Sequence, residues 1–429
     1  MHVCCIYTSE FLIQALNYGN RPVFEEVFPM GILYISSAIK QSGYKTTVNF
    51  ITNNDINNNG INNIVKQLKD NDTKIVAVSS VCENDYIFVK KILKNIKQKF
   101  PNVKVIIGGQ YPTLMPNEVF NNEDVNAICI GEGEIALVEY VKQVENNSYK
   151  KTDNLWIKGN NGEIFKCDRS LVIENLDLLP YPDRIGWIKA IKISVEDVTS
   201  QKIVIERGCN NRCIYCSHKA LSKVQEGKYL RFRNIKEIIK ELQFVCKEFP
   251  NTQYINLSMD NALSNISYFH DLINSLMMFN KTRENKLKFE ITFNVIPKIV
   301  DNIDEFIKLL KLTNIVKITC ALESGSLEIR KKLNRPYYTN DDVIKLCKKL
   351  KNVNIIVNIL LMYCYPFETE ETWNQTIQCL KECKPDMFSL MWLTPFKGTV
   401  LYDKFGVTKY DDAPLKDKTR FDNFLYSLK

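Results

Sequence analysis

The amino-acid sequence predicts an α/β protein, in which a doubly wound domain is followed by a partial (β/α)6 barrel. Short apolar, β-branched runs alternate with segments of 3.6-residue periodicity. This alternation occurs twice, with a stretch of different character between the two series. The pattern divides the chain into residues 1–145, a linker 146–200, residues 201–405 and a short tail 406–429. A chain of 429 residues is long enough for two to three domains.

Five strands are expected in residues 1–145, with helical segments between them. Near-continuous apolar strands separated by helices indicate a parallel sheet that is covered on both faces. The expected strands are HVCCIYT, KTTVNFI, KIVAVSS, VKVIIGG and AICIG. Ligands of such sheets bind beyond the carboxyl ends of the strands, where glycine lets them approach the backbone. The candidate binding residues at these ends are Ser79, Ser80, Gly108, Gly109, Gly131, Glu132 and Gly133.

Residues 146–200 break the alternation. The stretch NLWIKGNNGEIFKCD predicts a hairpin around Asn-Asn-Gly, and the prolines of LLPYPDR favour an extended path. From residue 201 the expected strands are KIVIE, YINLSMD, FEITFNV, IVKITCALES, NIIVNILLM and FSLMWLTPF. Asn234 and Glu237 fit a capping box for one intervening helix. Six such repeats predict an incomplete barrel with its active site at the C-terminal ends of the strands.

The composition is ordinary for a globular protein, with 45% hydrophobic and 25% charged residues. No apolar run reaches the ~18–20 residues of a membrane helix, and the start lacks signal-peptide features, so we expect a cytoplasmic protein. The net charge of +8 is spread over helices and turns, so specific nucleic-acid binding is not expected. Most of the fourteen cysteines are expected to be free and to pack as small hydrophobes. Cys379 and Cys383 share a helix face and are a secondary metal candidate.

Three cysteines stand apart from this pattern. Cys209, Cys213 and Cys216 lie in a polar loop, GCNNRCIYCSHK, directly after the first strand of the second series. A structural zinc site has four protein ligands, so zinc would need another ligand such as His218. A four-iron cluster also takes four thiolates. Three cysteines would therefore leave one iron open to a ligand that is not protein.

The motifs in both halves resemble one family. RGCNNRCIYC is similar to the RGC-x3-C-x-aromatic-C motif of the radical S-adenosylmethionine (SAM) superfamily. LESGSLEIRKKLNR, YPFETEETW and TPFKGTVLY are similar to its ES-G-S…NR, P-G-E-T and P-x-x-GT-x-LY segments. FPMGILYISSAIKQSGY, GGQYPTLMP, GEGE and PYPDR resemble the cobalamin-binding (B12-binding) domain found in one subgroup, which includes class B radical SAM methyltransferases. The resemblance covers residues 1–405.

The resemblance implies sites for three cofactors. The three loop cysteines would hold a [4Fe–4S] cluster whose fourth iron is chelated by SAM. An electron from the cluster would cleave SAM to methionine and a 5′-deoxyadenosyl radical. The implied SAM-binding residues are Tyr215, Asp260, Asn294, Glu323, Ser324 and Arg335. The strand-end serines, glycines and glutamate of the first domain would bind cobalamin, and no side chain is assigned a catalytic role.

Two features depart from the family pattern. Phe367 stands where the P-G-E-T turn has glycine. The first domain lacks D-x-H-x-x-G, and His2 is the only histidine in the first 200 residues. In this subgroup that absence is expected, with cobalamin bound base-off and no histidine on cobalt. The alternative is a domain that has lost cobalamin.

The implied reaction is methyl transfer from methylcobalamin to an unactivated carbon, or to phosphorus, with the protein positioning its cofactors. A rearrangement or cyclisation without methyl transfer is the second hypothesis, and a non-catalytic cobalamin- or metal-binding protein is the third. A methylthiotransferase is less favoured, because the first half has no second three-cysteine set. The substrate, a small molecule, peptide or lipid, is unknown. An external electron donor such as flavodoxin or ferredoxin is implied.

Overall fold

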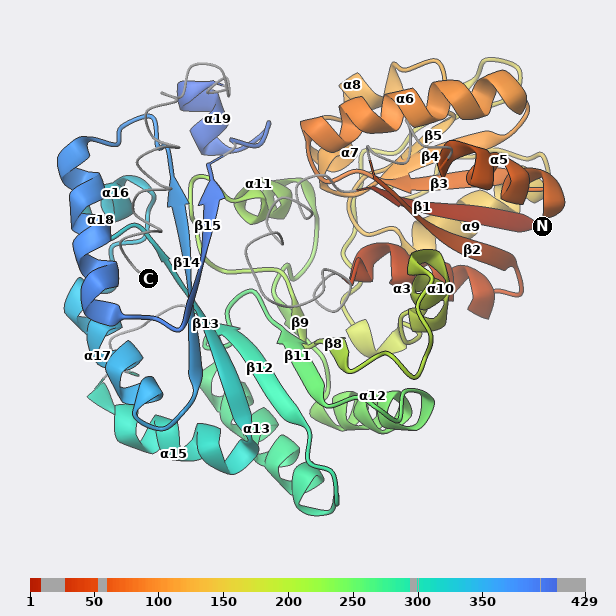
Figure 1. Ribbon diagram of the computed structural model, residues 1–429. Coiled ribbons are helices and arrows are strands. Elements are labelled where there is room, and N and C mark those ends of the chain that lie inside the picture. Colours follow the sequence, from red (N-terminus) through yellow and green to blue (C-terminus); the bar gives the residue numbers. More distant parts are fainter. Residues whose placement is uncertain (9–27, 53–59, 294–298, 300, 394, 407–429) are drawn as a thin grey trace. The chain divides into compact units, whose positions relative to one another are not determined.

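The computed structural model describes residues 1–8, 28–52, 60–293, 299, 301–393 and 395–406. The chain divides into two compact units (Figure 1). The first unit comprises residues 1–208 and 217–252, and the second comprises residues 209–216 and 253–429. The cysteine loop therefore belongs to the second unit, although the residues on both sides of it belong to the first.

The sheet of the first unit has the strand order β2-β1-β3-β4-β5-β6-β7. Its strands are β1 His2–Thr8, β2 Lys45–Ile51, β3 Ile75–Ser79, β4 Lys104–Gly108, β5 Ala127–Cys129, β6 Leu155–Lys158 and β7 Ile164–Lys166. The first five strands pair in parallel, as predicted, and the predicted hairpin β6–β7 adds two antiparallel strands. Since β2 and β3 flank β1, the strand order reverses there, which is where open α/β sheets bind ligands.

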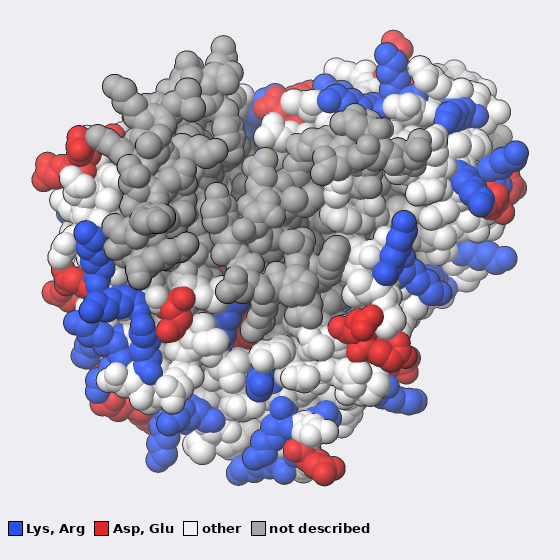
Figure 2. All heavy atoms as spheres, viewed as in Figure 1, with Lys and Arg blue, Asp and Glu red and all other residues white. Residues whose placement is uncertain are grey.

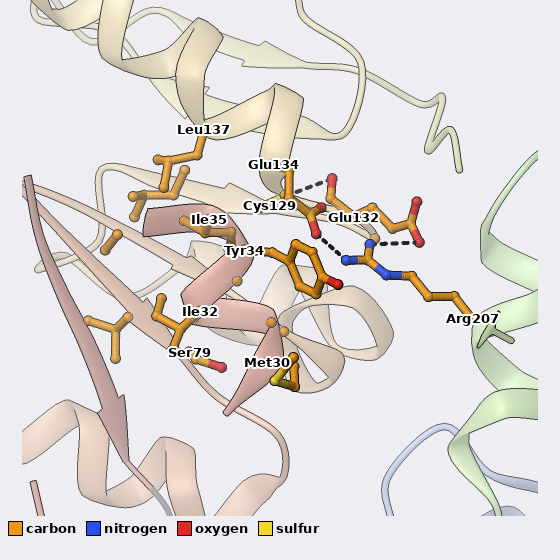
Figure 3. Close-up of a pocket in the computed structure, with 18 of the residues that line it drawn as sticks. Met30, Ile32, Tyr34, Ile35, Ser79, Cys129, Glu132, Glu134, Leu137 and Arg207 are labelled. Atoms are coloured by element: carbon orange, nitrogen blue, oxygen red, sulfur yellow. Dashed lines mark hydrogen bonds and ion pairs between the residues drawn. The ribbon is translucent and has the colours of Figure 1, made fainter. Parts of the chain in front are cut away.

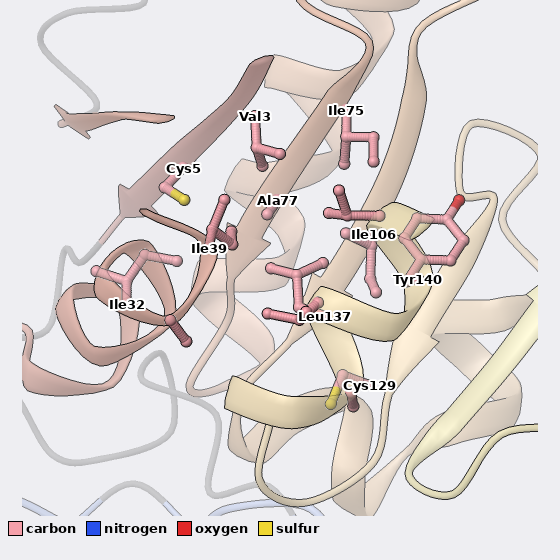
Figure 4. Packing of buried hydrophobic residues seen from close by; sticks show 14 of the residues in the cluster. Val3, Cys5, Ile32, Ile39, Ile75, Ala77, Ile106, Cys129, Leu137 and Tyr140 are labelled. Atoms are coloured by element: carbon pink, nitrogen blue, oxygen red, sulfur yellow. The ribbon is translucent and has the colours of Figure 1, made fainter. Parts of the chain in front are cut away.

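Helices cover both faces of this sheet, as alternation along a strand requires. Val3, Cys5 and Tyr7 point into a core shared with α3 and α9, part of which Figure 4 shows. Cys4 and Ile6 point into a second core beneath α5 and α6. The helices are α3 Met30–Gln41, α5 Gly60–Asp70, α6 Glu83–Lys99, α7 Gln110–Leu114, α8 Pro116–Phe120 and α9 Glu134–Glu145.

The rest of the first unit contains a buried ion network that joins α10 to α12. The elements of this part are α10 Arg184–Ile191, β8 Ser200–Val204, β9 Glu206–Arg207, α11 Ser217–Val224, β10 Arg231–Phe232 and α12 Ile235–Glu248. Glu241 of α12 accepts from Arg184 Nη2 at 2.6 Å and also bonds Arg233, and all three side chains are buried. Asn234 caps α12 by accepting from the Lys236 N–H, but the predicted capping box is not formed, because the Glu237 carboxylate bonds Lys240 instead of the Asn234 backbone.

The second unit contains five consecutive parallel strands in the order β11-β12-β13-β14-β15, as expected for a partial barrel. They are β11 Tyr254–Ser258, β12 Lys288–Phe293, β13 Ile315–Glu323, β14 Ile356–Tyr363 and β15 Met387–Trp392. The helices are α13 Ile266–Lys281, α15 Ile303–Thr313, α16 Leu327–Lys332, α17 Asn340–Lys351, α18 Glu370–Cys383 and α19 Val400–Phe405. The strand predicted to come first in this series, KIVIE, contributes β8, which is grouped with the first unit.

The surface carries charge of both signs. On the face shown in Figure 2, lysine and arginine side chains occur over both units and are interrupted by acidic ones. Among the helices that the structure describes, none is long and apolar enough to cross a membrane.

Removal of the Glu241 charge should strongly destabilise the first unit. Glu241→Gln leaves the buried Arg184 and Arg233 without a carboxylate, which costs about 3–5 kcal/mol. The matched control is Glu237→Gln on the same helix, whose exposed pair with Lys240 should contribute less than about 1 kcal/mol. Urea unfolding followed by circular dichroism measures both changes. Equal losses in the two variants would contradict the proposed importance of the network.

Candidate functional site

The cysteine loop is held by the backbone of the second unit. The Cys216 N–H donates to the Cys213 carbonyl at 3.2 Å, which closes a turn between the two thiols. The Ile214 N–H donates to the Leu333 carbonyl at 3.3 Å, and its own carbonyl accepts from the Leu401 N–H at 3.0 Å. The Asn334 side chain donates to the Arg212 carbonyl at 2.9 Å. The loop is therefore fixed by segments that lie far along the chain.

The three loop thiols fit an iron–sulfur cluster by the chemistry of their donor set. None of the three forms a disulfide, and Cys213 is buried while Cys209 and Cys216 are partly exposed. Thiolates are the protein ligands of such clusters. Across the described ranges, no three His, Cys, Asp or Glu side chains are already gathered as a metal-binding group. His218, the alternative zinc ligand, has its Nδ1 2.8 Å from the Tyr229 hydroxyl.

Three of the predicted SAM-binding residues lie together beside this loop. The Tyr215 hydroxyl donates to Glu323 Oε1 at 2.7 Å, and Arg335 Nη1 lies 3.5 Å from both of these oxygens. Arg335 Nη1 also lies 3.7 Å from Cys213 Sγ. Burial raises the pKa of the Glu323 carboxyl, against the opposing effects of Arg335 and Tyr215. Burial and the Glu323 charge raise the pKa of Tyr215.

Glu323 reaches this position through a strained backbone. It ends β13 with φ at +62°, in the left-handed region, and the pairing register with β14 shifts between Ala321 and Glu323. A non-glycine residue in that region costs about 1–3 kcal/mol, and such strain clusters at functional sites. The Tyr365 hydroxyl donates to the Glu323 carbonyl at 3.3 Å and holds the turn.

The other predicted SAM-binding residues are placed differently. Ser324 is buried, with its hydroxyl 3.1 Å from Thr376 Oγ1 and accepting from the Ser326 N–H, so it stabilises the turn after β13. Asp260 is exposed and lies just beyond the end of β11. Asn294 lies outside the described residues.

Phe367, at the unusual position of the P-G-E-T segment, stacks on Tyr365 with ring centroids 5.8 Å apart. Thr369 of the same segment forms a capping box with Thr372 at the start of α18. The segment is therefore stabilised by aromatic packing and a helix cap, with no glycine at residue 367.

Cys379 and Cys383 are buried on α18, with their sulfurs 3.9 Å apart. Hydrogen bonding between thiols raises both pKa values, in Cys379 through Cys383 and in Cys383 through Cys347. Protonated thiols in this setting pack as small hydrophobes.

A cavity of about 300 Å³ opens at the carboxyl ends of the strands in the first unit (Figure 3). Six of the seven predicted cobalamin-binding residues line it, namely Ser79, Gly108, Gly109, Gly131, Glu132 and Gly133. Its other walls are mostly apolar and include Ile32, Ala77, Ile106 and Leu137. Ser80 does not line the cavity. Its side chain is fully buried, and its hydroxyl has no hydrogen-bond partner among the described residues.

Glycine is required at two turns around this cavity. Gly109 has φ at +105°, and a Cβ there would lie 2.5 Å from the Ser80 carbonyl oxygen. Gly131 has φ at +87°, and a Cβ there would lie 2.5 Å from Ser170 Oγ. The glycines let a ligand approach the backbone, and most of the other lining residues are apolar. Such a cavity suits part of a large organic cofactor better than a metal ion.

No histidine is among the described residues that line the cavity. His2 begins β1, at the other end of the strands, and its Nδ1 lies 2.7 Å from Thr73 Oγ1. Burial lowers the pKa of His2. The described fold therefore keeps this histidine away from the cavity.

Arg207 is a pocket residue that the sequence did not single out. Its guanidinium bonds Glu134 at 2.5 Å and Glu132 at 3.3 Å, and it lies 5.0 Å from the centroid of the Tyr34 ring (Figure 3). Arg231 forms two further bonds to Glu132, at 2.8 and 2.9 Å. Arg207 belongs to the RGC motif and the two glutamates to the GEGE motif. The sequence alone could not show that they contact each other, because they are more than 70 residues apart in the chain.

A three-thiol loop and a glycine-lined cavity in one α/β chain are the features expected of a cofactor-dependent enzyme. Family models agree with this class: the radical SAM superfamily matches residues 203–380, and the B12 binding domain matches residues 20–141. The chain therefore contains a B12-binding domain followed by a radical SAM domain. The radical SAM domain implies SAM and a [4Fe–4S] cluster as cofactors, and the B12-binding domain implies cobalamin.

Individual relatives span most of the chain. An uncharacterised methyltransferase of Pyrococcus horikoshii is 22% identical over 87% of this chain and 78% of its own length. An anaerobic magnesium-protoporphyrin IX monomethyl ester cyclase of Synechocystis is 21% identical over 94% of this chain and 77% of its own. The radical SAM methyltransferase TsrM of Kitasatospora setae, solved with cobalamin and a [4Fe–4S] cluster, has the same fold. Its TM-score is 0.68 at 14% identity, over 93% of this chain and 76% of that chain.

Gly109→Ala should disrupt the cavity, because the new methyl group would collide with the Ser80 carbonyl. Gly43→Ala is the matched control, since Gly43 also has a positive φ, at +86°, but has no atom within 4 Å of its Cβ position. The control should lose only about 1–2 kcal/mol of stability, which is the cost of a left-handed backbone at a residue with a side chain. Thermal unfolding should show a clearly larger loss for Gly109→Ala. Similar losses would mean that the turn after β4 relaxes without cost.

Proposed function

We propose that the protein is a cobalamin-dependent radical SAM methyltransferase that acts on an unactivated carbon or on phosphorus. The observation that carries this proposal is the presence in one chain of a three-thiol loop and a glycine-lined cavity without histidine. The loop would hold the cluster and the cavity would hold part of a cobalamin, a cofactor that supplies methyl-transfer chemistry when bound. The Pyrococcus relative is named as an uncharacterised methyltransferase, and the match covers 78% of its length. It supports the same reaction.

The loop cysteines would hold the cluster, and Tyr215, Glu323 and Arg335 would shape the SAM site beside it. When bound, the cluster supplies the electron that cleaves SAM, and cobalamin carries the methyl group. Glu323 has a buried carboxylate at a strand end, a suitable acceptor for the two hydroxyls of a ribose. The predicted roles of Ser324, Asp260 and Asn294 at SAM stay predictions.

In the first unit, the cavity would take the base of the displaced cobalamin tail. A volume of about 300 Å³ lies at the small end for ligand pockets, so the cavity would hold only a part of the cofactor. Ser79 and the backbone of the glycines would line that part. The predicted role of Ser80 stays a prediction.

A ring closure or rearrangement without methyl transfer is the second candidate reaction. The relative from Synechocystis that is named as a cyclase favours it. The mass of the product separates the two reactions, since only methyl transfer adds a methyl group. For the electron donor we propose flavodoxin or ferredoxin, and for the substrate a small molecule, peptide or lipid. Fourteen cysteines without a disulfide suit a reducing compartment such as the cytoplasm.

The first test is the cofactor content of protein that is purified without oxygen and reconstituted with iron, sulfide and hydroxocobalamin. We expect about four irons per chain and one bound corrinoid. Substitution of all three loop cysteines by alanine should remove the iron and leave the corrinoid. Cys167→Ala, which changes a partly exposed cysteine outside the loop, is the control and should keep both. Zinc in place of iron would refute the proposal that the protein is a radical SAM enzyme and would support a non-catalytic metal-binding protein.

Gly108→Ala should weaken cobalamin binding alone. Its backbone is not left-handed, and the new methyl group would lie 3.5 Å from Cys129 Cβ, so the fold should tolerate it. The methyl group would, however, occupy cavity space, and overpacking of about 1–3 kcal/mol weakens binding roughly tenfold or more. Corrinoid absorbance after gel filtration measures retention. Unchanged retention would place the cofactor elsewhere.

Methyl transfer predicts labelled products. The reconstituted protein is incubated with a reductant, SAM whose methyl group is deuterated, and fractions of small molecules, peptides and lipids. Mass spectrometry should find a product that carries the deuterated methyl group, together with deoxyadenosine, and only when cobalamin is present. A product formed at full rate without cobalamin would rule out the proposed mechanism.

A further inference from the structure

We propose that Arg335 is a positioning residue for Cys213, and that its guanidinium raises the reduction potential of the cluster held there. The inference rests on the proposed [4Fe–4S] site and deepens it. The resemblance to the family assigned Arg335 to SAM. The structure also places its Nη1 3.7 Å from Cys213 Sγ, where it can donate a hydrogen bond to the sulfur.

The backbone around Arg335 supports a role at the loop. Leu333 and Asn334, the two residues before it, bond the backbone of the residues on either side of Cys213. Asn334 is left-handed, with φ at +63°, which turns the chain from α16 into this contact. Arg335 Nη2 donates to the Ala321 carbonyl of β13 at 3.0 Å. Three consecutive residues therefore fix one cysteine and its neighbours to the end of a strand.

The charge on Arg335 acts in a buried setting. The residue is 4% exposed, and the rings of Tyr337 and Tyr338 have their centroids 5.8 and 5.9 Å from its guanidinium carbon. Glu323 pairs with it, with Oε1 3.5 Å from Nη1. Coulomb interactions are strong where water is excluded.

The sign of the effect follows from charge. A one-electron reduction makes a cluster and its thiolates more negative, and a neighbouring cation favours the more negative state. Hydrogen bonds to the sulfurs are among the factors that set the potentials of iron–sulfur clusters. Arg335 should therefore make the cluster easier to reduce. A residue that only bound SAM would leave the potential unchanged when SAM is absent.

The test compares reconstituted wild type, Arg335→Gln, Arg335→Lys and Arg212→Gln. Arg212 directly precedes Cys213 but is exposed, so Arg212→Gln removes the same charge without removing a buried contact. The midpoint potential of the cluster is measured without SAM, by reductive titration followed by electron paramagnetic resonance. Arg335→Gln should be about tenfold harder to reduce, which is about 59 mV for a one-electron couple. Arg335→Lys should fall between wild type and Arg335→Gln, and Arg212→Gln should stay near wild type.

The outcomes separate this inference from the proposed function. If wild type and Arg335→Gln hold the cluster at equal potentials, the role of Arg335 is overturned and the cluster site stands. If Arg212→Gln shifts the potential as much as Arg335→Gln, general charge explains the effect and the inference is overturned. If Arg335→Gln assembles no cluster, the midpoint potential of Arg335→Lys is compared with that of wild type. A lower potential in Arg335→Lys supports the role of Arg335, and an equal potential overturns it. Wild type without iron would refute both proposals.

Discussion

Parallel strand pairing is the constraint on which both cofactor sites depend. Strands that run in the same direction must be joined by crossovers, so all of their carboxyl ends meet at one edge of a sheet. In the first unit this edge brings together Ser79, Gly108 and the GEGE turn around one cavity. In the second unit it places Asp260 and Glu323 at the ends of their strands. The antiparallel hairpin β6–β7 ends the parallel run of the first sheet and contributes nothing to its cavity.

Each proposed site has an arginine, and the two differ in what surrounds the guanidinium. Arg207 is partly buried and pairs with two carboxylates, Glu132 and Glu134, so it helps to hold the GEGE turn at the cavity. Arg335 is buried, pairs with Glu323 and has its Nη1 3.7 Å from Cys213 Sγ. The first arginine therefore links two side chains of the cavity lining, whereas the second brings positive charge to a proposed cluster ligand.

The sequence predicted the fold because period-2 and period-3.6 patterns report local structure. The strands of both sheets, the hairpin and the Asn234 cap all followed from such patterns. Local spacing also marked the cysteine loop and the strand-end glycines. It could not reveal that Arg335 contacts Cys213, or that Arg207 joins the GEGE turn, because these pairs are more than 70 residues apart in the chain. Nor could it show that the Ser324 hydroxyl faces Thr376, since orientation at a strand end depends on the bulge at Glu323.

The burial of most cysteines has a consequence for how such a protein acquires its cluster. Nine of the fourteen thiols are buried, and burial raises the pKa of Cys4, Cys5, Cys82 and Cys129 to about 12. At neutral pH such groups are almost entirely protonated, and a thiol reacts with metals or oxidants chiefly as its thiolate. The partly exposed Cys209 and Cys216 meet incoming iron with fewer competitors than a count of cysteines suggests. Cys213 is itself buried, so burial would reduce the number of thiols that compete for iron at the proposed site, while the loop would bring the third ligand to the other two.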